Sequence, residues 1–118
     1  APEDCGIRIV YGHEVEDMTA TQIANTILDH VGDAACYLTF DIDCLDPAFA
    51  PGTGTPVAGG PSSAKMLSVL QKLGGLDMKG ADIVEVAPAY DHADITAIAG
   101  ATVAMHYLGL LAERRSRR

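Results

Sequence analysis

Several residue types are scarce in this 118-residue sequence, and each shortage excludes a class of protein. Tryptophan is absent and aromatic residues make up only 5% of the chain, yet 48% of the residues are hydrophobic, which is enough for a folded core. No apolar run approaches the roughly 18 residues that a transmembrane helix needs, so a membrane protein is not expected. The three cysteines, Cys5, Cys36 and Cys44, are an odd number without metal-ligand spacing. They indicate free thiols and a cytoplasmic location rather than a disulfide framework.

Basic residues are also scarce. The chain has 16 acidic and 8 basic residues, and half of the basic ones are arginines at positions 114, 115, 117 and 118. The acidic body repels phosphate backbones, so nucleic-acid binding is not expected and cationic ligands are favoured. The arginine tail has two interpretations: a patch for nucleic acid or membrane, or a solvated end that complements the dipole of a terminal helix. We favour the second.

Short apolar runs alternate with amphipathic stretches along the whole chain. The runs predict strands at residues 7–11, 35–41 and 81–86. Thr19 with Gln22 forms a capping box before a first helix, residues 61–63 open a second that ends at Gly74, and Asp94 is placed to cap a third that runs to about residue 112. This β-α-β-α-β-α order predicts an α/β fold, a parallel sheet with flanking helices.

The longest irregular stretch, residues 42–60, follows the carboxyl end of the second predicted strand. It contains three prolines and four glycines. Open α/β sheets bind their ligands at this end of the strands, and a loop this long in a compact domain is usually functional. We therefore expect a binding site here.

Asp41 and Asp43 stand at the start of this loop. Side chains alternate along an extended backbone, so both carboxylates are expected on one side, where they would repel each other without a cation. Oxygen ligands of this kind favour Mg²⁺ or Mn²⁺. The spacing does not fit a calcium-binding EF-hand. A phosphoaspartate hydrolase remains a remote alternative, because Leu45 stands where that motif has threonine or valine.

Glu85 lies between Val84 and Val86 in the third predicted strand. A carboxylate among apolar neighbours needs a partner. A cationic ligand is one candidate, since a guanidinium group pairs with a carboxylate through two parallel hydrogen bonds. A bond to a helix or a subunit contact is the alternative.

Residues 37–60, 83–91 and 95–103 together resemble the C-terminal half of the ureohydrolases, the family of arginase, agmatinase and guanidinobutyrase. The resemblance implies that residues 1–118 are a single partial domain, the closing part of an arginase-like three-layer α/β fold. It implies that Asp41 and Asp43 are ligands of a two-manganese cluster, and that Glu85 and Thr55 bind the guanidinium group of the substrate. The implied reaction is hydrolysis of a guanidine, with agmatine as the expected substrate and putrescine and urea as products.

The resemblance also implies residues that do not occur in this chain. The other manganese ligands of the family belong to G-x-D-H and D-x-H-x-D segments, which this sequence lacks, and no catalytic residue is assigned within it. Two hypotheses follow: an enzyme in which this chain supplies part of the site, or a catalytically incomplete chain that serves as an oligomerisation or binding module. The family implies a homo-oligomer, a trimer or hexamer, or pairing with the missing N-terminal half.

Overall fold

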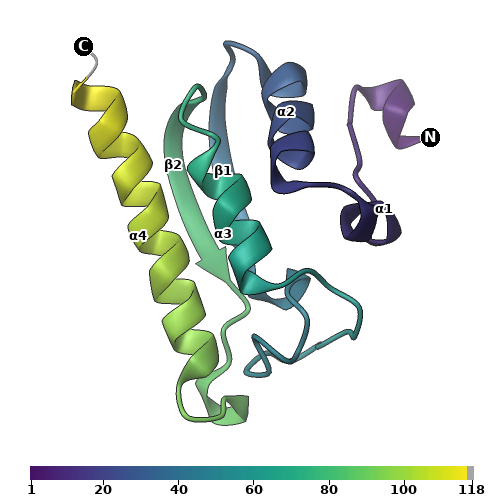
Figure 1. Ribbon diagram of the computed structural model, residues 1–118, viewed down its shortest axis with the longest axis vertical. Helices are drawn as coiled ribbons and strands as arrows, with labels where there is room; N and C mark the ends of the chain where they lie inside the picture. The colour runs from purple at the N-terminus through teal and green to yellow at the C-terminus, as the bar shows by residue number, and fades with distance from the viewer. Residues whose placement is uncertain (117–118) are drawn as a thin grey trace.

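The structure, a computed structural model, describes residues 1–116, which form two parallel strands and four α-helices (Figure 1). The α-helices and strands are α1 (Gly12–Asp17), α2 (Ala20–Val31), β1 (Ala35–Asp41), α3 (Ser63–Gln71), β2 (Asp77–Val84) and α4 (Ile95–Ser116). Short 3-10 helices lie at η1 (Pro2–Cys5), η2 (Ile42–Cys44) and η3 (Pro88–Tyr90).

One predicted strand is confirmed, and another has different bounds from those predicted. β1 has the predicted bounds, and β2 begins and ends earlier than the predicted 81–86. The strands pair in register to their ends, with Asp41 opposite Val84, after one irregularity between Cys36 and Tyr37. β2 stops at Val84 because the next residue has a positive φ of 69° and cannot continue an extended strand.

The strand predicted at residues 7–11 is wrong. Residues 7–10 have no regular secondary structure, and Tyr11 is the N-cap of α1. A strand needs a neighbour to bind its backbone N–H and C=O groups. Within residues 1–116 the sheet contains only β1 and β2, so this apolar segment has no strand beside it.

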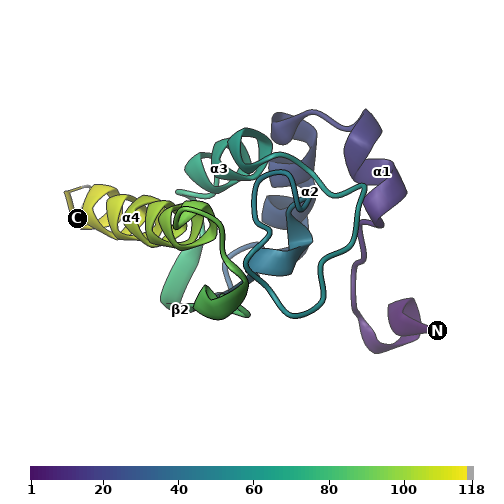
Figure 2. The same ribbon diagram turned by 90° about the horizontal axis from the view of Figure 1, so that it is seen from below.

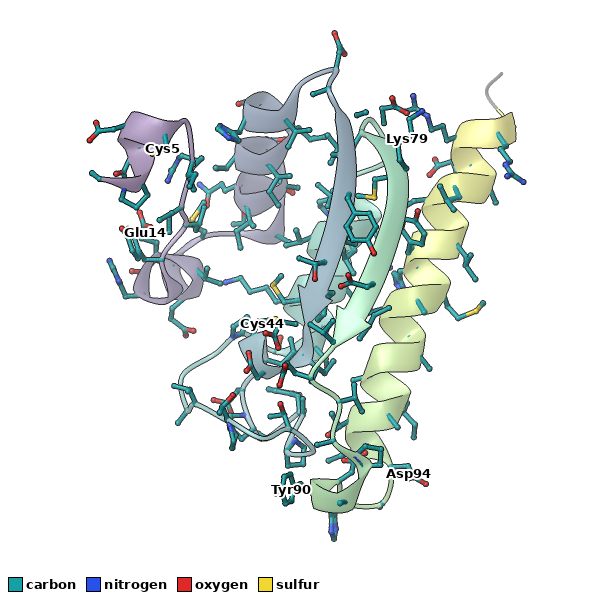
Figure 3. All side chains as sticks on the ribbon, turned by 180° about the vertical axis from the view of Figure 1, so that it is seen from behind. Cys5, Glu14, Cys44, Lys79, Tyr90 and Asp94 are labelled. Atoms are coloured by element: carbon teal, nitrogen blue, oxygen red, sulfur yellow. The ribbon has the colours of Figure 1, made fainter. Side chains whose placement is uncertain are left out.

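The helices lie on one face of the sheet (Figure 2). Side chains alternate along β1, so Phe40 is buried on the helix-covered face, whereas Tyr37 is 61% exposed on the other. In the view from behind, no helix lies in front of the strands (Figure 3). The described helices therefore form one covering layer, and the opposite face of the sheet presents Tyr37 and Thr39, whose hydroxyls both donate to Asp82.

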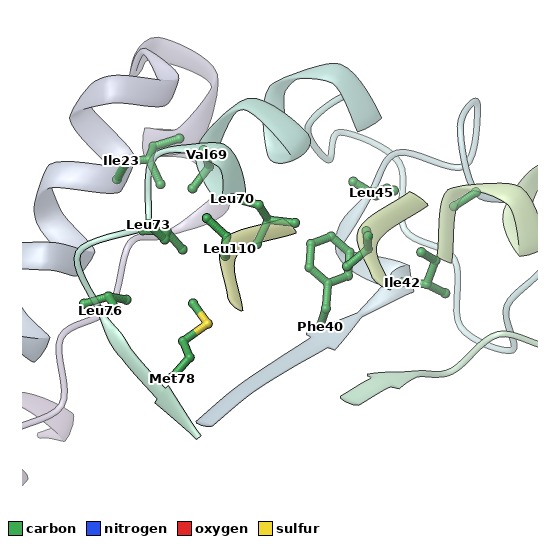
Figure 4. Close-up of a cluster of buried hydrophobic side chains, with 13 residues drawn as sticks. Ile23, Phe40, Ile42, Leu45, Val69, Leu70, Leu73, Leu76, Met78 and Leu110 are labelled. Carbon is green, nitrogen blue, oxygen red and sulfur yellow. The ribbon is translucent and has the colours of Figure 1, made fainter. Parts of the chain in front are cut away.

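The hydrophobic core lies between this sheet face and the helices (Figure 4). Its buried side chains come from every α-helix after α1 and from both strands; they include Ile23, Phe40, Val69, Leu70, Met78, Val103 and Leu110. Two of the three predicted helix caps are confirmed. Thr19 and Gln22 form a reciprocal capping box with bonds of 2.9 and 3.1 Å, and the Ser62 hydroxyl accepts from Lys65 N–H at 3.1 Å.

The final helix, α4, corrects the expectation that no apolar stretch approaches the length of a transmembrane helix. It is the one helix in the described residues that is long and apolar enough to cross a membrane, with a mean hydropathy of 1.6 in its 18-residue window. Threonine, glycine, histidine and tyrosine interrupt its apolar run, but isoleucine, leucine, valine and alanine keep the average high. α4 packs against β2 and α3, although only 17% of that window is buried.

The last described turn of α4 is attached to the start of β2. The Arg114 guanidinium donates to the Leu76 carbonyl at 2.8 Å and forms an ion pair with Asp77 at 3.2 Å. Arg114 and Arg115 lie in the last turn, where cations complement the helix dipole. The rest of the predicted arginine tail, residues 117 and 118, lies outside the described residues.

Candidate functional site

The carboxyl edge of the sheet brings the predicted site residues together. β1 ends at Asp41 and β2 ends opposite it at Val84, so Asp43 and Glu85 follow at the same edge. Thr55 returns to this edge from the long loop, and its hydroxyl donates to Asp43 Oδ2 at 3.0 Å. Cys44 marks the region in Figure 3. Four residues from three separate segments thus meet where parallel sheets bind ligands.

The two aspartates are neighbours for a different reason from the predicted strand alternation. The strand ends at Asp41, and residues 42–44 form the 3-10 helix η2. Asp41 caps this turn by accepting a hydrogen bond from the Asp43 N–H at 3.1 Å, while Ile42 is fully buried in the core. The local turn therefore holds both carboxylates at the edge of the sheet.

The carboxylates form a region of uncompensated negative charge. Burial raises the pKa of Asp41, and the neighbouring charges of Asp43 and Glu85 raise it further. Among the described residues, none of these three acids takes part in an ion pair. Cys44 is exposed as a residue, but loss of hydration at its thiol and the charges of both aspartates raise its pKa to about 11. This edge therefore favours a bound cation.

Glu85 is not a buried residue inside a strand, as the sequence predicted. It lies one residue beyond β2, is exposed, and has a left-handed backbone with φ 69°. Such a conformation is costly for a residue with a side chain, and strained residues of this kind cluster at functional sites. It turns the chain at the end of β2 while the Glu85 carboxylate stays close enough to raise the pKa of Asp41.

The long loop is held in place from its own interior by Asp46. Its carboxylate accepts from the backbone N–H groups of Ala48 and Gly59, each at 2.9 Å, and its own N–H donates to the Pro61 carbonyl at 3.1 Å. The bonds from Ala48 and Gly59 lower the pKa of Asp46. These bonds tie Asp46, near the start of the loop, to Gly59 and Pro61 at its end, so the loop forms a fixed wall of the site.

Gly60 allows the closest approach within this loop. A Cβ at this position would lie 2.5 Å from the Cys44 carbonyl oxygen and 2.8 Å from the Asp46 nitrogen. We expect Gly60→Ala to lower the free energy of unfolding by about 3 kcal/mol, because backbone atoms cannot move aside as a flexible side chain would. Urea denaturation measures the change. Gly54→Ala is the matched control, since nothing lies within 4 Å of its added Cβ; an equal loss in both variants would contradict the clash.

Two residues that connect this loop to α4, Asp91 and Thr96, were not predicted from the sequence. Asp94, the predicted cap, has φ 61°, and the capping carboxylate is that of Asp91. It accepts from the N–H groups of Thr96 and Ala97, each at 3.0 Å. The fully buried Thr96 hydroxyl accepts from the Gly52 N–H at 2.8 Å. An aspartate followed five residues later by threonine at a helix start was the available signal.

The loop also borders an open hollow beside Asp43. Asp43, Cys44, Asp46 and residues 57–60 line one side, and Gly12, His13 and Glu16 line the other; its volume is ≈ 740 Å³. Lys65 holds α1 in this position by donating to the Val15 carbonyl at 2.5 Å. A smaller cavity of ≈ 170 Å³ between α3 and α4 is lined mainly by apolar side chains and includes none of the site carboxylates.

A divalent cation fits the chemistry of these donors, although they do not complete a site. Asp41 and Asp43 offer hard carboxylate oxygens with excess negative charge, as Mn²⁺ or Mg²⁺ requires. Within residues 1–116, no group of three or more histidine, cysteine, aspartate and glutamate side chains is arranged to hold a metal ion. The described residues therefore supply part of a metal site.

Known proteins are similar to this chain in sequence. A model of the arginase family matches residues 1–109. The agmatinase of Photorhabdus laumondii is 50% identical over 112 residues, which is 95% of this chain and 36% of that protein. The agmatinase of Neisseria meningitidis serogroup C is 55% identical over 97 residues, 82% of this chain and 32% of that protein. The chain thus spans about a third of the length of these curated relatives.

Solved structures extend the likeness to the fold. A hypothetical agmatinase from Burkholderia thailandensis superposes with a TM-score of 0.89 at 50% identity, covering 96% of this chain and 39% of that one. Proclavaminate amidino hydrolase from Streptomyces clavuligerus gives a TM-score of 0.92 at 38% identity over 95% of this chain and 37% of that one. The sheet and helices described above are therefore those of an arginase-like fold, and the chain belongs to the arginase family.

Proposed function

We propose that this chain is part of a manganese-dependent ureohydrolase that hydrolyses agmatine to putrescine and urea. The observation that carries the proposal is the meeting of Asp41, Asp43, Glu85 and Thr55 at one sheet edge, joined by the 3.0 Å bond from Thr55 to Asp43. Relatives named agmatinase at 50% and 55% identity support the choice of substrate. In this proposal, residues 1–118 are a partial domain of the complete enzyme.

Each residue has a chemical role in this proposal. Asp41 and Asp43 would hold manganese through carboxylate oxygens, and the ion, when bound, supplies an activated water and stabilises developing negative charge. Glu85 would pair with the substrate guanidinium through two parallel hydrogen bonds. Thr55 would orient Asp43 while its hydroxyl lies beside the guanidinium. The formal net charge of −8 favours the approach of a dication such as agmatine.

The complete protein is proposed to work in the cytoplasm as a homo-oligomer, a trimer or hexamer. The family and the three free thiols support this setting. The partners are then a small cationic guanidine and further copies of the protein, and neither nucleic acid nor membrane is proposed as a partner, in keeping with the acidic composition.

A second candidate is a catalytically incomplete chain that acts as an oligomerisation or binding module. The observation that favours it is that residues 1–116 place no more than two potential metal ligands together. This candidate predicts at most one weak manganese site and no turnover.

Manganese titration and urea release separate the two candidates. We expect the protein expressed from its full reading frame to bind two Mn²⁺ ions tightly and to release urea from agmatine faster than from arginine. Chelation should abolish the activity, and added Mn²⁺ should restore it. Calorimetry and a colorimetric urea assay are the measurements. At most one weak site and no urea from any guanidine would contradict the enzyme and support the binding module.

A further inference from the structure

Gly52 is held between the two segments that flank the proposed guanidinium site. Its N–H donates to the Thr96 hydroxyl at 2.8 Å, and its carbonyl accepts from the Ala87 N–H at 2.8 Å. Gly52 and Thr96 are buried, so water does not compete for these bonds. The long loop is therefore tied on one side to the first turn of α4 and on the other to the chain that follows Glu85.

The α4 side of this connection is itself fixed. The Asp91 carboxylate accepts from the N–H groups of His92, Thr96 and Ala97 at 2.9–3.0 Å. Although loss of hydration acts in the other direction, a hydrogen bond from the Thr96 hydroxyl and these backbone bonds lower the pKa of Asp91 to about 2. The Thr96 hydroxyl thus accepts from Gly52, while the Asp91 carboxylate holds the backbone of the turn that carries Thr96. A Cβ on Gly52 would lie 2.7 Å from that of Asp91, so the approach requires glycine.

Both proposed guanidinium ligands are a few residues from this connection. Thr55 follows Gly52 by three residues and bonds to Asp43, and Glu85 precedes Ala87 by two. The intervening Thr53 hydroxyl is buried without a hydrogen-bond partner among the described residues, which is costly. The bonds at Gly52 therefore hold the loop despite the free-energy cost of the unbonded Thr53 hydroxyl, and they set the separation between Thr55 and Glu85.

We propose that Thr96 is a positioning residue for guanidinium recognition, acting through Gly52 to fix Thr55 relative to Glu85. Thr96 does not touch the substrate in this role. The inference rests on the proposed ureohydrolase function and adds a determinant that lies in the first turn of α4.

The test is the pair Thr96→Val and Thr96→Ser in the complete protein. Valine keeps the branched shape but loses the hydroxyl, whereas serine keeps the hydroxyl. We expect Thr96→Val to raise KM for agmatine at least fivefold with a smaller change in kcat and an unchanged manganese content. Thr96→Ser should stay within twofold of the parent. Thr102→Val is the matched control, because it removes a hydroxyl that bonds only within α4, to the Ile98 carbonyl.

Amide hydrogen exchange gives a readout that does not depend on turnover. Exchange at Gly52 and Ala87 should accelerate at least tenfold in Thr96→Val but not in Thr102→Val. An unchanged KM in Thr96→Val, equal effects of both valine variants, or a serine variant as impaired as the valine variant would overturn the positioning role alone. No urea release by the parent protein would overturn the proposed function and this role together.

Discussion

Replacing Asp43 by asparagine is expected to abolish manganese-dependent guanidine hydrolysis. The change removes the negative charge of a proposed ligand but keeps an oxygen that can accept from the Thr55 hydroxyl, so the loop is not released. Removal of groups that merely support metal ligands costs about 10- to 100-fold in affinity or activity. We therefore expect loss of a direct ligand to lower activity by more than about 100-fold, with manganese bound per chain falling in parallel.

Stability measurements separate loss of a ligand from misfolding. Asp43 is one of the charges that raise the pKa of Asp41, so removing it relieves repulsion in the metal-free protein. The free energy of unfolding without metal should stay constant or rise in Asp43→Asn. Asp46→Asn is the contrasting control, because that carboxylate accepts backbone bonds within the loop. It should lower stability while leaving both proposed ligands in place. Full manganese content and activity in Asp43→Asn would reject Asp43 as a ligand.

The parts of the fold that were predictable depend on local signals. β1 has the predicted bounds because its alternation and flanking turn residues are clear, and the capping box of Thr19 and Gln22 determines the start of α2. The grouping of Asp41 with Asp43 also depends on neighbours in sequence. Its cause was not predicted, because the strand ends at Asp41 and a 3-10 turn, not an extended backbone, brings Asp43 beside it.

The features that were predicted wrongly are determined by contacts between residues far apart in the sequence. Residues 7–11 have strand-forming side chains, but strand formation needs a pairing partner that no local pattern encodes. Glu85 appeared to be in a strand because Val84 and Val86 flank it, whereas a positive φ ends the strand before it. Backbone strain of this kind is sustained by surrounding contacts, here those of Gly52 with Ala87, which are far apart in the sequence.

The hydrogen-bonded connection through Thr96 also could not be predicted from local sequence. Asp91 and Asp94 are both suitable helix caps by residue type, and only the path of the chain after η3 decides between them. The role of Gly52 could not be read from the loop either, because its close neighbour Asp91 is 39 residues away in sequence. Residue types thus indicated where chemistry would occur, whereas the supports of the site required the tertiary structure.

Two substitutions at Glu85 should have different effects, because one removes only the charge of its side chain and the other also relieves its backbone conformation. Glu85→Gln keeps the shape but removes the charge that would pair with a guanidinium. Hydrogen bonds to a charged group contribute about 1.5–3 kcal/mol, so kcat/KM for agmatine should fall on the order of 10- to 150-fold. Glu3→Gln, an equal charge change on exposed η1, should leave kcat/KM unchanged. An unchanged kcat/KM in Glu85→Gln would remove Glu85 from the guanidinium site.

Glu85→Gly should lose activity to the same extent while gaining stability. Glycine adopts φ 69° without the steric cost of a side chain, which is roughly 1–2 kcal/mol for other residues. Removing the carboxylate also relieves repulsion of Asp41 in the metal-free protein. We expect the free energy of unfolding to rise by about 1 kcal/mol, measured by urea denaturation without metal. A glycine variant less stable than the parent would contradict the backbone strain. A more stable but inactive variant would mean that the protein retains a strained glutamate because substrate binding requires its carboxylate.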